Sequence, residues 1–428
     1  HSPLGHAGAA LRTGVAQDEG TKLPLVPNTV RIRAQAPLGL TPAQYALDPR
    51  SVASAATLFD TRKSVDQTQA GLVYERRIDA DNGLRLMIYG GQRQTTQFQS
   101  IPVAVQTPPT QSGGVIDLTR KYAGMDLRWT TRLALAGRPL EVATGLAYDT
   151  LDESRQGYEN FIAGPSGTLL GVQGRLRRDE RNDAYNLDPY MQASWQLAGR
   201  WTLEGGFRYS TVNIDSSDRY IRPGNGDDSG SARYQRLLPA AALRYAFTDD
   251  VSLYGAWGRG YETPTLNELS YRPDGQGGLN LGLQPSVNDS VELGAKARIA
   301  GGMATAALFH TRTDDEIVTA TNVGGRSTYR NAPSTPRDGV ELSWLHETKG
   351  HWQTQLAYTW LRARYADAFC STTPCGPGAG VPAGNQIPGV APQVLYASFG
   401  YVPPQGWRVG VGARAVGAVG AGDRNTVS

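Results

Sequence analysis

The sequence contains no run of about 18 uninterrupted apolar residues, which is the length that a membrane-spanning helix requires. Apolar residues make up only 39% of its 428 residues, whereas glycine (51) and proline (26) are frequent. This pattern excludes a transmembrane helix. A closed β-barrel stays possible, because it satisfies its own backbone hydrogen bonds in lipid and its strands have a weak hydropathy signal.

Cysteine is also scarce, and neither sign of charge is in marked excess. The net charge of +3 is small for this length and gives no indication of nucleic-acid binding. The two cysteines, Cys370 and Cys375, lie close together in the segment FCSTTPCGPG. A disulfide between them would close a small loop and indicate an oxidising compartment, with two free thiols as the alternative. No histidine or further cysteine lies nearby in sequence, so a metal site there has less support.

The start of the chain lacks an export signal. Its first residues, HSPLGHAGAALRTG, have no basic segment followed by an apolar core. For an exported protein, such a beginning is expected of a mature form or of a fragment.

Tight turns recur along the whole chain. They fall near residues 19, 81, 137, 199, 249, 301, 348 and 405, roughly 47 to 62 residues apart. Each turn joins two segments of about ten residues in which apolar and polar residues alternate, and this predicts a β-hairpin at each turn. The hairpins together predict about sixteen strands.

Long irregular segments, such as 33–64 and 271–290, separate the predicted hairpins. All of them fall at the same end of the strands, opposite the tight turns. Structureless connections of this length are uncommon in compact soluble domains. Short turns at one rim and long loops at the other are typical of outer-membrane barrels.

The alternation within the strands separates an apolar face from a polar face. In 201–212, Trp201, Leu203 and Phe207 occupy the face opposite Glu204. The apolar faces must rest either on a second sheet or on lipid. Sixteen such strands would need several soluble domains, yet no linker divides the chain. We therefore predict an all-β fold, a transmembrane antiparallel up-and-down barrel whose polar faces enclose a lumen.

Several segments resemble the TonB-dependent receptor family of outer-membrane proteins. They are LYGAWGRGYETPTLNELSY (253–271), NLGLQPSVNDSVELGAKARI (280–299), LFHTRTDDEIV (308–318), STYRNAPSTPRDGVELSW (327–344) and NQIPGVAP (385–392). Within the family, the resemblance is closest to the enterobacterial receptors for pyrroloquinoline quinone (PQQ). The segments that carry this closer resemblance include 60–77, 91–102, 113–132 and 259–283.

The resemblance implies a 22-stranded barrel with a globular plug in its lumen and a short energy-coupling box before the plug. The box, the plug and the last strands have no counterpart in residues 1–428. We therefore expect this chain to be the barrel portion of a receptor, without its plug and its C-terminal strands.

The resemblance also implies a function: energy-coupled uptake across the bacterial outer membrane, without a cofactor and without enzyme activity. The expected ligand is PQQ, with a ferric siderophore as the alternative. The expected partners are the TonB complex, acting through the plug, and membrane lipid, but no nucleic acid. A passive porin, an outer-membrane enzyme and a soluble all-β binding array are the competing interpretations.

PQQ is a flat tricarboxylate, which bidentate arginine contacts and aromatic stacking would hold. A first group of candidates lies in the second long loop, with Arg120 at its end, and two further groups follow in later loops. The alternative for each arginine is a pair with a lumen carboxylate or with the plug. The candidate ligand-binding residues are Arg93, Gln97, Gln99, Arg120, Arg259, Tyr271, Arg272, Asn280, Arg326 and Tyr329.

Other motifs favour no chemistry. NGDDSG (225–230) and TDDEI (313–317) lack the ligand spacing of a calcium loop. GPSGT (164–168) is not the Gly-x-Ser-x-Gly nucleophile motif. The five histidines show no metal-binding pattern.

Overall fold

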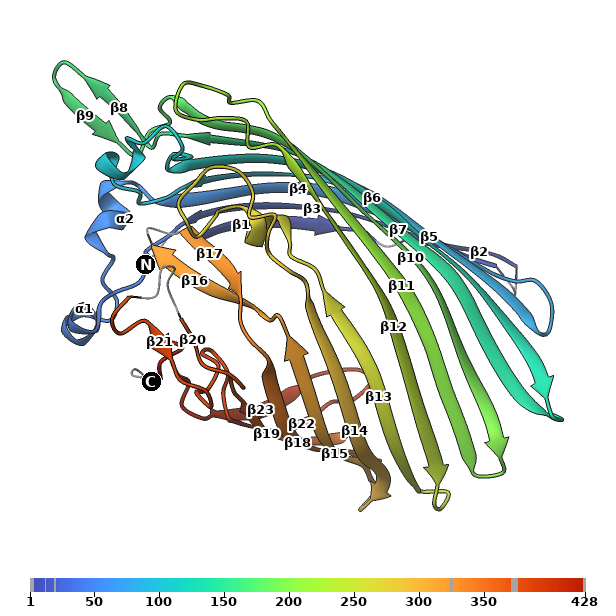
Figure 1. Cartoon of the computed structure of the whole chain (residues 1–428). Coiled ribbons are helices and arrows are strands. Elements are labelled where there is room, and N and C mark those ends of the chain that lie inside the picture. Colours follow the sequence, from blue (N-terminus) through green and yellow to red (C-terminus); the bar gives the residue numbers. More distant parts are fainter. Residues whose placement is uncertain (1–3, 12, 19–20, 324–325, 371–375, 426–428) are drawn as a thin grey trace.

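The computed structural model describes residues 4–11, 13–18, 21–323, 326–370 and 376–425. Within these ranges, long antiparallel strands form one large curved sheet of 17 strands (Figure 1). β1 and β2 pair with β3 one after the other and so share one position. The sheet therefore has sixteen strand positions, and the prediction of about sixteen strands is confirmed.

The strands of this sheet follow one another in chain order. They are β1 (Leu4–Ala10), β2 (Thr13–Asp18), β3 (Thr21–Gln35), β4 (Arg62–Arg77), β5 (Asn82–Phe98), β6 (Val115–Leu135), β7 (Arg138–Tyr158), β10 (Leu176–Ala198), β11 (Trp201–Asp218), β12 (Gly230–Ala246), β13 (Val251–Glu262), β14 (Ser286–Ile299), β15 (Gly302–Asp314), β18 (Thr335–Glu347), β19 (Trp352–Ala363), β22 (Gln393–Tyr401) and β23 (Val409–Val416).

Small elements occupy the long connections. They are α1 (Pro42–Leu47), α2 (Ser54–Leu58), the 3-10 helix η1 (Val103–Gln106), β8 (Phe161–Gly164), β9 (Gly167–Leu170), α3 (Leu266–Leu269), β16 (Ile317–Val323), β17 (Arg326–Asn331), β20 (Phe369–Cys370) and β21 (Gly380–Val381). No helix among the described residues is both long enough and apolar enough to cross a membrane.

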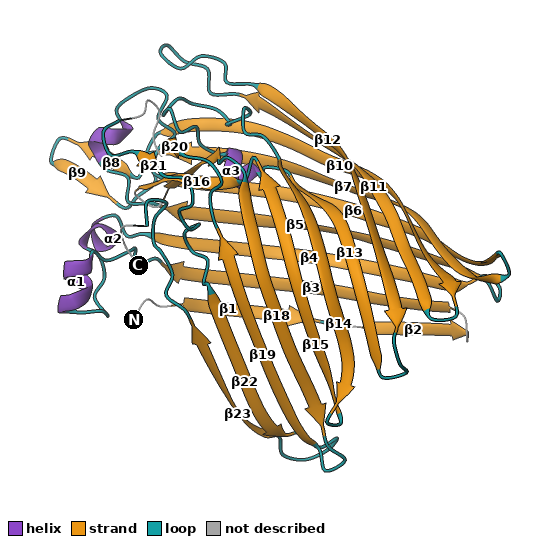
Figure 2. Cartoon of the chain, turned by 60° about the horizontal axis from the view of Figure 1, so that its bottom comes forward, coloured by secondary structure: helices purple, strands orange, loops and turns teal. Residues whose placement is uncertain are grey.

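Tight turns and long connections lie at opposite ends of the sheet (Figures 1 and 2). Seven of the predicted turns are confirmed, and the one near residue 19 lies outside the described residues. Two of them place consecutive residues at positive φ: Ala136 and Gly137 at 52° and 72°, and Ala300 and Gly301 at 51° and 74°. Such pairs form the turns whose twist matches that of the flanking strands.

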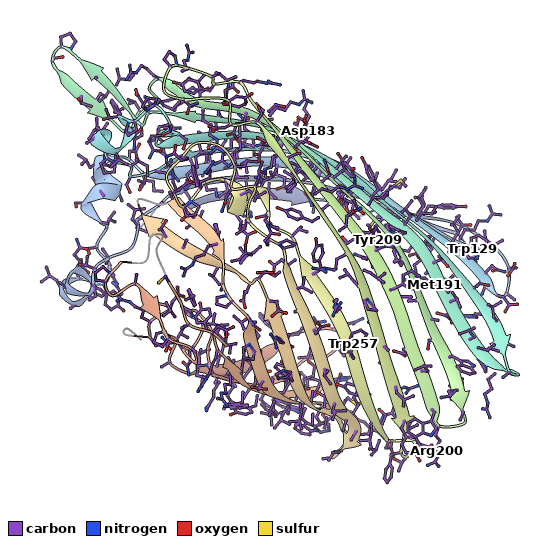
Figure 3. All side chains as sticks on the ribbon, viewed as in Figure 1. Trp129, Asp183, Met191, Arg200, Tyr209 and Trp257 are labelled. Atoms are coloured by element: carbon purple, nitrogen blue, oxygen red, sulfur yellow. The ribbon has the colours of Figure 1, made fainter. Side chains whose placement is uncertain are left out.

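The apolar face of the strands points away from the lumen and is uncovered. Leu293 on β14 and its cross-strand neighbour Leu308 on β15 are 62% and 59% exposed. Within the described residues, no second sheet packs on this face. Figure 3 labels Trp129 and Met191 among the side chains of this sheet. The prediction that the apolar faces meet lipid, and do not meet another layer of protein, agrees with this exposure.

Aromatic residues line both margins of the apolar face. Near the tight turns, Trp201 packs against Tyr245 with ring centroids 4.5 Å apart, and Trp352 stacks on Phe399 at 4.9 Å. At the other margin, Tyr148 and Tyr185 lie 6.3 Å apart on neighbouring strands. Aromatic belts at both margins are typical of membrane barrels.

The strands extend well beyond the apolar face, so the predicted length of about ten residues is wrong for many of them. β6 and β7 have 21 residues each and β10 has 23. On the outer face of β10, Leu187 and Tyr185 are followed by Asp183 and then Arg181, which pairs with Asp152 on β7. The added residues are polar on both faces, so hydropathy gave no signal for them. Figure 3 places Asp183 toward the loop end of the sheet.

One loop folds onto the lumen side of the sheet. β12 pairs with β13 only along 240–246 and 252–258, so the two strands separate toward the loop end. There, α3 and the residues after it pack on the inner faces of β11 and β12. The cluster that they form contains Ile214, Tyr234, Leu266, Leu269, Leu279 and Leu283. Its apolar burial holds the loop against the wall.

Candidate functional site

Three cations lie together on the inner wall near the loop end. Arg93 on β5 stands opposite Arg120 on β6, and Lys63 on β4 stands opposite Gln97 on β5. Among the described residues, neither Lys63 nor Arg93 forms an ion pair or a side-chain hydrogen bond. Partial withdrawal from water and the charges of Arg93 and Arg120 lower the pKa of Lys63. Like charges this close repel, so the wall is suited to an anionic partner.

A buried carboxylate connects this wall with the next two strands. Glu153 on β7 has no exposed side-chain surface and forms an ion pair with Arg120. Asn182 on β10 donates to Glu153 Oε1 at 2.9 Å. Arg120 also donates to Asn267 of α3 at 3.0 Å, so the same arginine contacts the folded-in loop.

Three further arginines surround the residue pair that follows α3. Arg155 on β7 donates to the hydroxyl of Ser270, and Arg178 on β10 donates to the Ser270 carbonyl at 2.7 Å. The guanidinium carbons of Arg326, Arg155 and Arg178 lie 4.1, 5.1 and 5.6 Å from the ring centroid of Tyr271. Arginine over an aromatic face is attracted by the ring quadrupole.

The charges around Tyr271 change its acidity. Burial raises the pKa of the phenol, but the positive charges of Arg326, Arg155 and Arg178 and a hydrogen bond from Arg155 outweigh that effect. The net result lowers the pKa of Tyr271 to about 8 from its ordinary value of 10.0. A phenolate is therefore a stable partner for these arginines at mildly alkaline pH.

The β16–β17 hairpin ties several loops together. Arg326 donates to Gln111 and to the carbonyl of Gly113, both before β6. Arg330 donates to the Cys370 carbonyl and lies 3.1 Å from the Asp423 carboxylate. Connections that are far apart in sequence thus meet over the lumen at the loop end (Figure 2).

The disulfide prediction concerns the same loop end. Cys370 is disulfide-bonded. Cys375 lies outside the described residues, so the pairing of these two cysteines stays a prediction.

A cavity of about 490 Å³ lies between α3 and the inner wall. Arg120, Tyr122, Asp149 and Asn267 line it together with apolar residues of the loop. The N-terminus of α3 is fixed by a capping box in which Thr265 and Glu268 bond each other's backbone. The cavity combines an arginine, aromatic rings and amides, which are the groups that a large polar ligand requires.

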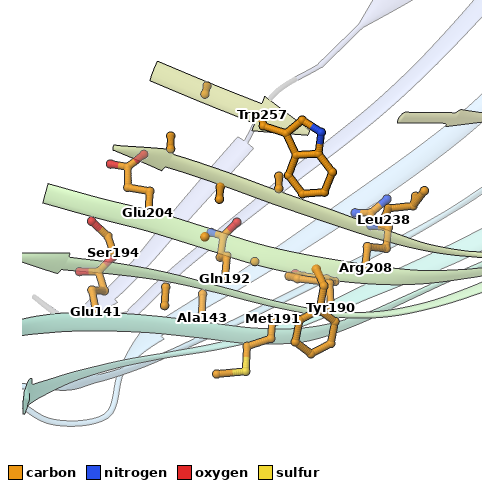
Figure 4. A pocket seen from close by; sticks show the side chains of 18 of the residues that line it. Glu141, Ala143, Tyr190, Met191, Gln192, Ser194, Glu204, Arg208, Leu238 and Trp257 are labelled. Atoms are coloured by element: carbon orange, nitrogen blue, oxygen red, sulfur yellow. The ribbon is translucent and has the colours of Figure 1, made fainter. Parts of the chain in front are cut away.

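A second hollow, of about 760 Å³, lies lower on the wall (Figure 4). Small residues form its floor, among them Gly206, where a side chain would meet the Met191 carbonyl at 2.5 Å. Glu141 and Glu204 flank it toward the tight turns. None of the predicted ligand residues lies there, so it shapes the lumen below the candidate site.

The first group of predicted site residues lies on the wall and in part outside the predicted loop. β5 continues to Phe98, so Arg93 and Gln97 are strand residues, and their assignment to a loop is wrong. The stretch QRQTTQF is polar on both faces, which made it look like a loop. Gln99 follows the strand and is 3% exposed beneath the 99–114 connection. Arg120 lies within β6 and not at the end of the loop.

The later groups are divided by the structure. Arg259 pairs with Asp289 at 3.0 Å on the same face as Trp257, away from the wall cations. Arg272 pairs with Asp274 at 2.6 Å within its own loop. Both arginines thus have a carboxylate partner, although neither carboxylate lies on the lumen wall as the alternative expected.

Tyr271, Arg326, Asn280 and Tyr329 are brought together. Asn280 donates to the Tyr329 carbonyl at 3.2 Å, which joins the loop after α3 to the β16–β17 hairpin. Tyr329 also packs against the apolar cluster under α3. Whether any of these residues contacts a ligand stays a prediction.

Sequence reasoning missed four residues of this site. They are Lys63, Glu153, Arg155 and Arg178. Each lies in a polar strand end that resembles solvated surface when read alone. The alternation of faces could have identified two of them. If it is extended past the apolar segment of the strand, it places Glu153 and Arg155 on the lumen face.

Comparison with known proteins gives the same architecture. Residues 11–427 match the family model described as "TonB dependent receptor-like, beta-barrel". The siderophore receptor PiuA from Acinetobacter baumannii superimposes with a TM-score of 0.73 at 15% identity. That match covers 99% of this chain and 66% of PiuA.

Two curated relatives align with about half of the chain. The pesticin receptor of Yersinia enterocolitica is 26% identical over 215 residues, which cover 45% of this chain and 30% of the receptor. The rhizobactin receptor of Rhizobium meliloti (strain 1021) is 25% identical over 235 residues, 49% of this chain and 30% of that receptor. The chain thus covers less than a third of the length of either relative.

Proposed function

Because this chain belongs to the TonB-dependent receptor β-barrel family, whose members are outer-membrane proteins, we propose that it forms the wall and the ligand chamber of an energy-coupled uptake receptor. The observation that carries the proposal is the inner wall at the loop end. Lys63 and Arg93 lie there beside Arg120 without a carboxylate of their own among the described residues. An anionic ligand would supply the missing charge.

The ligand that we propose is an anionic ferric siderophore. The curated relatives are receptors for pesticin and rhizobactin, and the superimposed structure is that of a siderophore receptor. PQQ is the second candidate, favoured by the sequence resemblance and by carboxylates that would suit the same cations. None of the relatives named above is a PQQ receptor, so the siderophore has the broader support.

In the whole receptor, we propose that a plug domain fills the lumen and that the TonB complex acts on it from the periplasm. The polar inner faces support this arrangement, since they offer charges such as Glu141 and Glu204 that a soluble domain could pair with. Lipid would surround the exposed apolar face. The barrel contributes recognition and walls, and no residue of the described site is assigned a chemical step.

The test is equilibrium binding of PQQ and of a panel of ferric siderophores to the full-length receptor in detergent. We expect tight binding of an anionic ferric siderophore and a loss of roughly tenfold or more when Lys63→Gln and Arg93→Gln are combined, since a hydrogen bond to a charged group contributes about 1.5–3 kcal/mol. Arg312→Gln is the matched control, because Arg312 pairs with Asp314 in an exposed ion pair. Binding of PQQ alone would replace the siderophore, and binding of neither would overturn the proposal.

A further inference from the structure

We propose that Arg155, Arg178 and Arg326 form an anion subsite that Tyr271 occupies in this structure as an internal substitute for the ligand. An anionic oxygen group of the ligand, a carboxylate or a phenolate, takes the place of the Tyr271 phenol when it binds. The inference rests on the proposed function, because it assigns a subsite within the same chamber. We call these three arginines the arginine triad.

The triad converges on one short segment from three separate elements. Arg155 comes from β7, Arg178 from β10 and Arg326 from the start of β17. Their partners on the loop are the hydroxyl and carbonyl of Ser270 and the ring of Tyr271. The three guanidinium groups thus bind the oxygen acceptors of Ser270 and the ring face of Tyr271. Proteins use arginine in the same way to bind carboxylates and phenolates.

The loop does not satisfy all the donors of the triad. Arg178 is only 7% exposed, yet its Nη2 has no hydrogen-bond partner among the described residues. The same holds for Nε of Arg326. Buried donors without partners cost free energy, and structures rarely contain them unless another group completes the site. A ligand group with two oxygens would offer more acceptors than one phenol oxygen does.

The surrounding carboxylates do not neutralise the arginines. Arg178 pairs with Glu180, while Glu153 is shared between Arg155 and Arg120. Arg272 is engaged by Asp274, and Asp228 lies at the periphery of Arg178. Positive charge therefore remains in excess at the triad. This excess accounts for the lowered pKa of Tyr271. It also favours an anionic group over a neutral phenol at the triad.

Displacement of Tyr271 would affect the loop that contains α3. It lies directly after α3, whose residues cover the cavity beside Arg120. Release of Tyr271 and Ser270 from the triad removes the polar anchors that the triad provides. The loop then keeps the apolar cluster under α3 and the hydrogen bonds of Asn267 and Asn280. Ligand binding and opening of the loop are then coupled through competition for the same guanidinium groups.

The experiment compares an anionic with a neutral ferric chelate on the full-length receptor. Ferric citrate carries negative charge, and ferrichrome is neutral. In Tyr271→Phe the ring stays and only the competing oxygen is lost, so we expect the affinity for ferric citrate to rise about fivefold or more and that for ferrichrome to stay unchanged. Arg178→Gln should lower the affinity for ferric citrate about tenfold. Tyr45→Phe is the control, because Tyr45 lies on α1 and is 63% exposed.

A second measurement is independent of uptake. The tyrosinate absorbance of the receptor is titrated with and without citrate, and the difference from Tyr271→Phe isolates one phenol. If citrate occupies the triad, the titration of Tyr271 moves from about pH 8 toward its ordinary value. If citrate causes no shift, or if wild type and Tyr271→Phe bind ferric citrate equally well, the proposal that Tyr271 substitutes for the ligand is wrong. Failure of every chelate to bind wild type counts against the proposed function, whereas the citrate titration still decides the subsite.

Discussion

Arg120 on β6 and Glu153 on β7 stand at directly paired positions and form an ion pair in which the carboxylate has no exposed side-chain surface. Glu153 also accepts a hydrogen bond from Asn182, and its negative charge stabilises the charged guanidinium of Arg155. One buried acid thus connects the open cationic wall at Lys63 and Arg93 with the arginine triad. The two halves of the site share this residue as their common electrostatic support.

Removing that charge should destabilise the loop end of the barrel. Glu153→Gln leaves Arg120 and Arg155 without their compensating carboxylate, and breaking a buried pair costs about 3 kcal/mol. Chemical unfolding of the detergent-solubilised receptor measures the loss. Asp249→Asn is the control, because Asp249 is exposed in a tight turn and forms no ion pair among the described residues; a change below about 0.5 kcal/mol is expected there. Equal effects of the two substitutions would contradict this role of Glu153.

Tyr271 should titrate near pH 8, earlier than an ordinary tyrosine. Its pKa is lower in the folded state than in the unfolded chain, so ionisation stabilises the folded loop. This contribution is absent below about pH 8, grows between pH 8 and 10, and is complete above pH 10. A difference of two pKa units corresponds to about 3 kcal/mol. The stability difference between wild type and Tyr271→Phe should therefore widen from pH 7 to pH 10; a constant difference would count against the charged environment of Tyr271.

An arginine should destabilise the protein much more on one face of β15 than on the other. Leu308 lies on the exposed apolar face, and its neighbour Ala307 lies on the lumen face opposite Glu341. Leu308→Arg should cost about 2–4 kcal/mol in lipid, the range measured for arginine at the bilayer midplane. Ala307→Arg should cost far less, because the lumen face is polar. Folding into phospholipid vesicles, followed by chemical unfolding, measures both, and equal costs would mean that the faces are wrongly assigned.

Arg330 should hold the β16–β17 hairpin to the neighbouring connection. Its guanidinium contacts Asp423, the Cys370 carbonyl and, at 4.7 Å, the ring of Phe369. Arg330→Ala removes a largely buried charge-assisted contact and should loosen the loop end by about 2 kcal/mol. The readout is the rate of chymotrypsin cleavage in the extracellular loops of the intact receptor, which should rise several-fold. Arg312→Ala is the control, since an exposed ion pair contributes little to stability. If Arg330→Ala is cleaved at the same rate as this control, Arg330 does not hold the hairpin in place.

The strand count and the two faces were predictable because both depend on local rules. Side chains alternate with a period of two, and turn pairs such as Ala136 and Gly137 need positive φ at adjacent positions. The strand ends were not predictable from hydropathy. Above the apolar belt, both faces of β5 are polar, so Arg93 and Gln97 resembled a loop although they continue a ladder.

The sequence by itself determined which face of each strand is apolar, how many strands there are, and that the long connections share one end. Only the tertiary structure decided which charges meet: that Arg259 is neutralised by Asp289 on the next strand, and that Tyr271 lies among Arg155, Arg178 and Arg326. The reason is physical. Alternation and turn geometry act over neighbouring residues, whereas the partners of a loop arginine depend on how separate connections fold over the lumen and exclude water from one another.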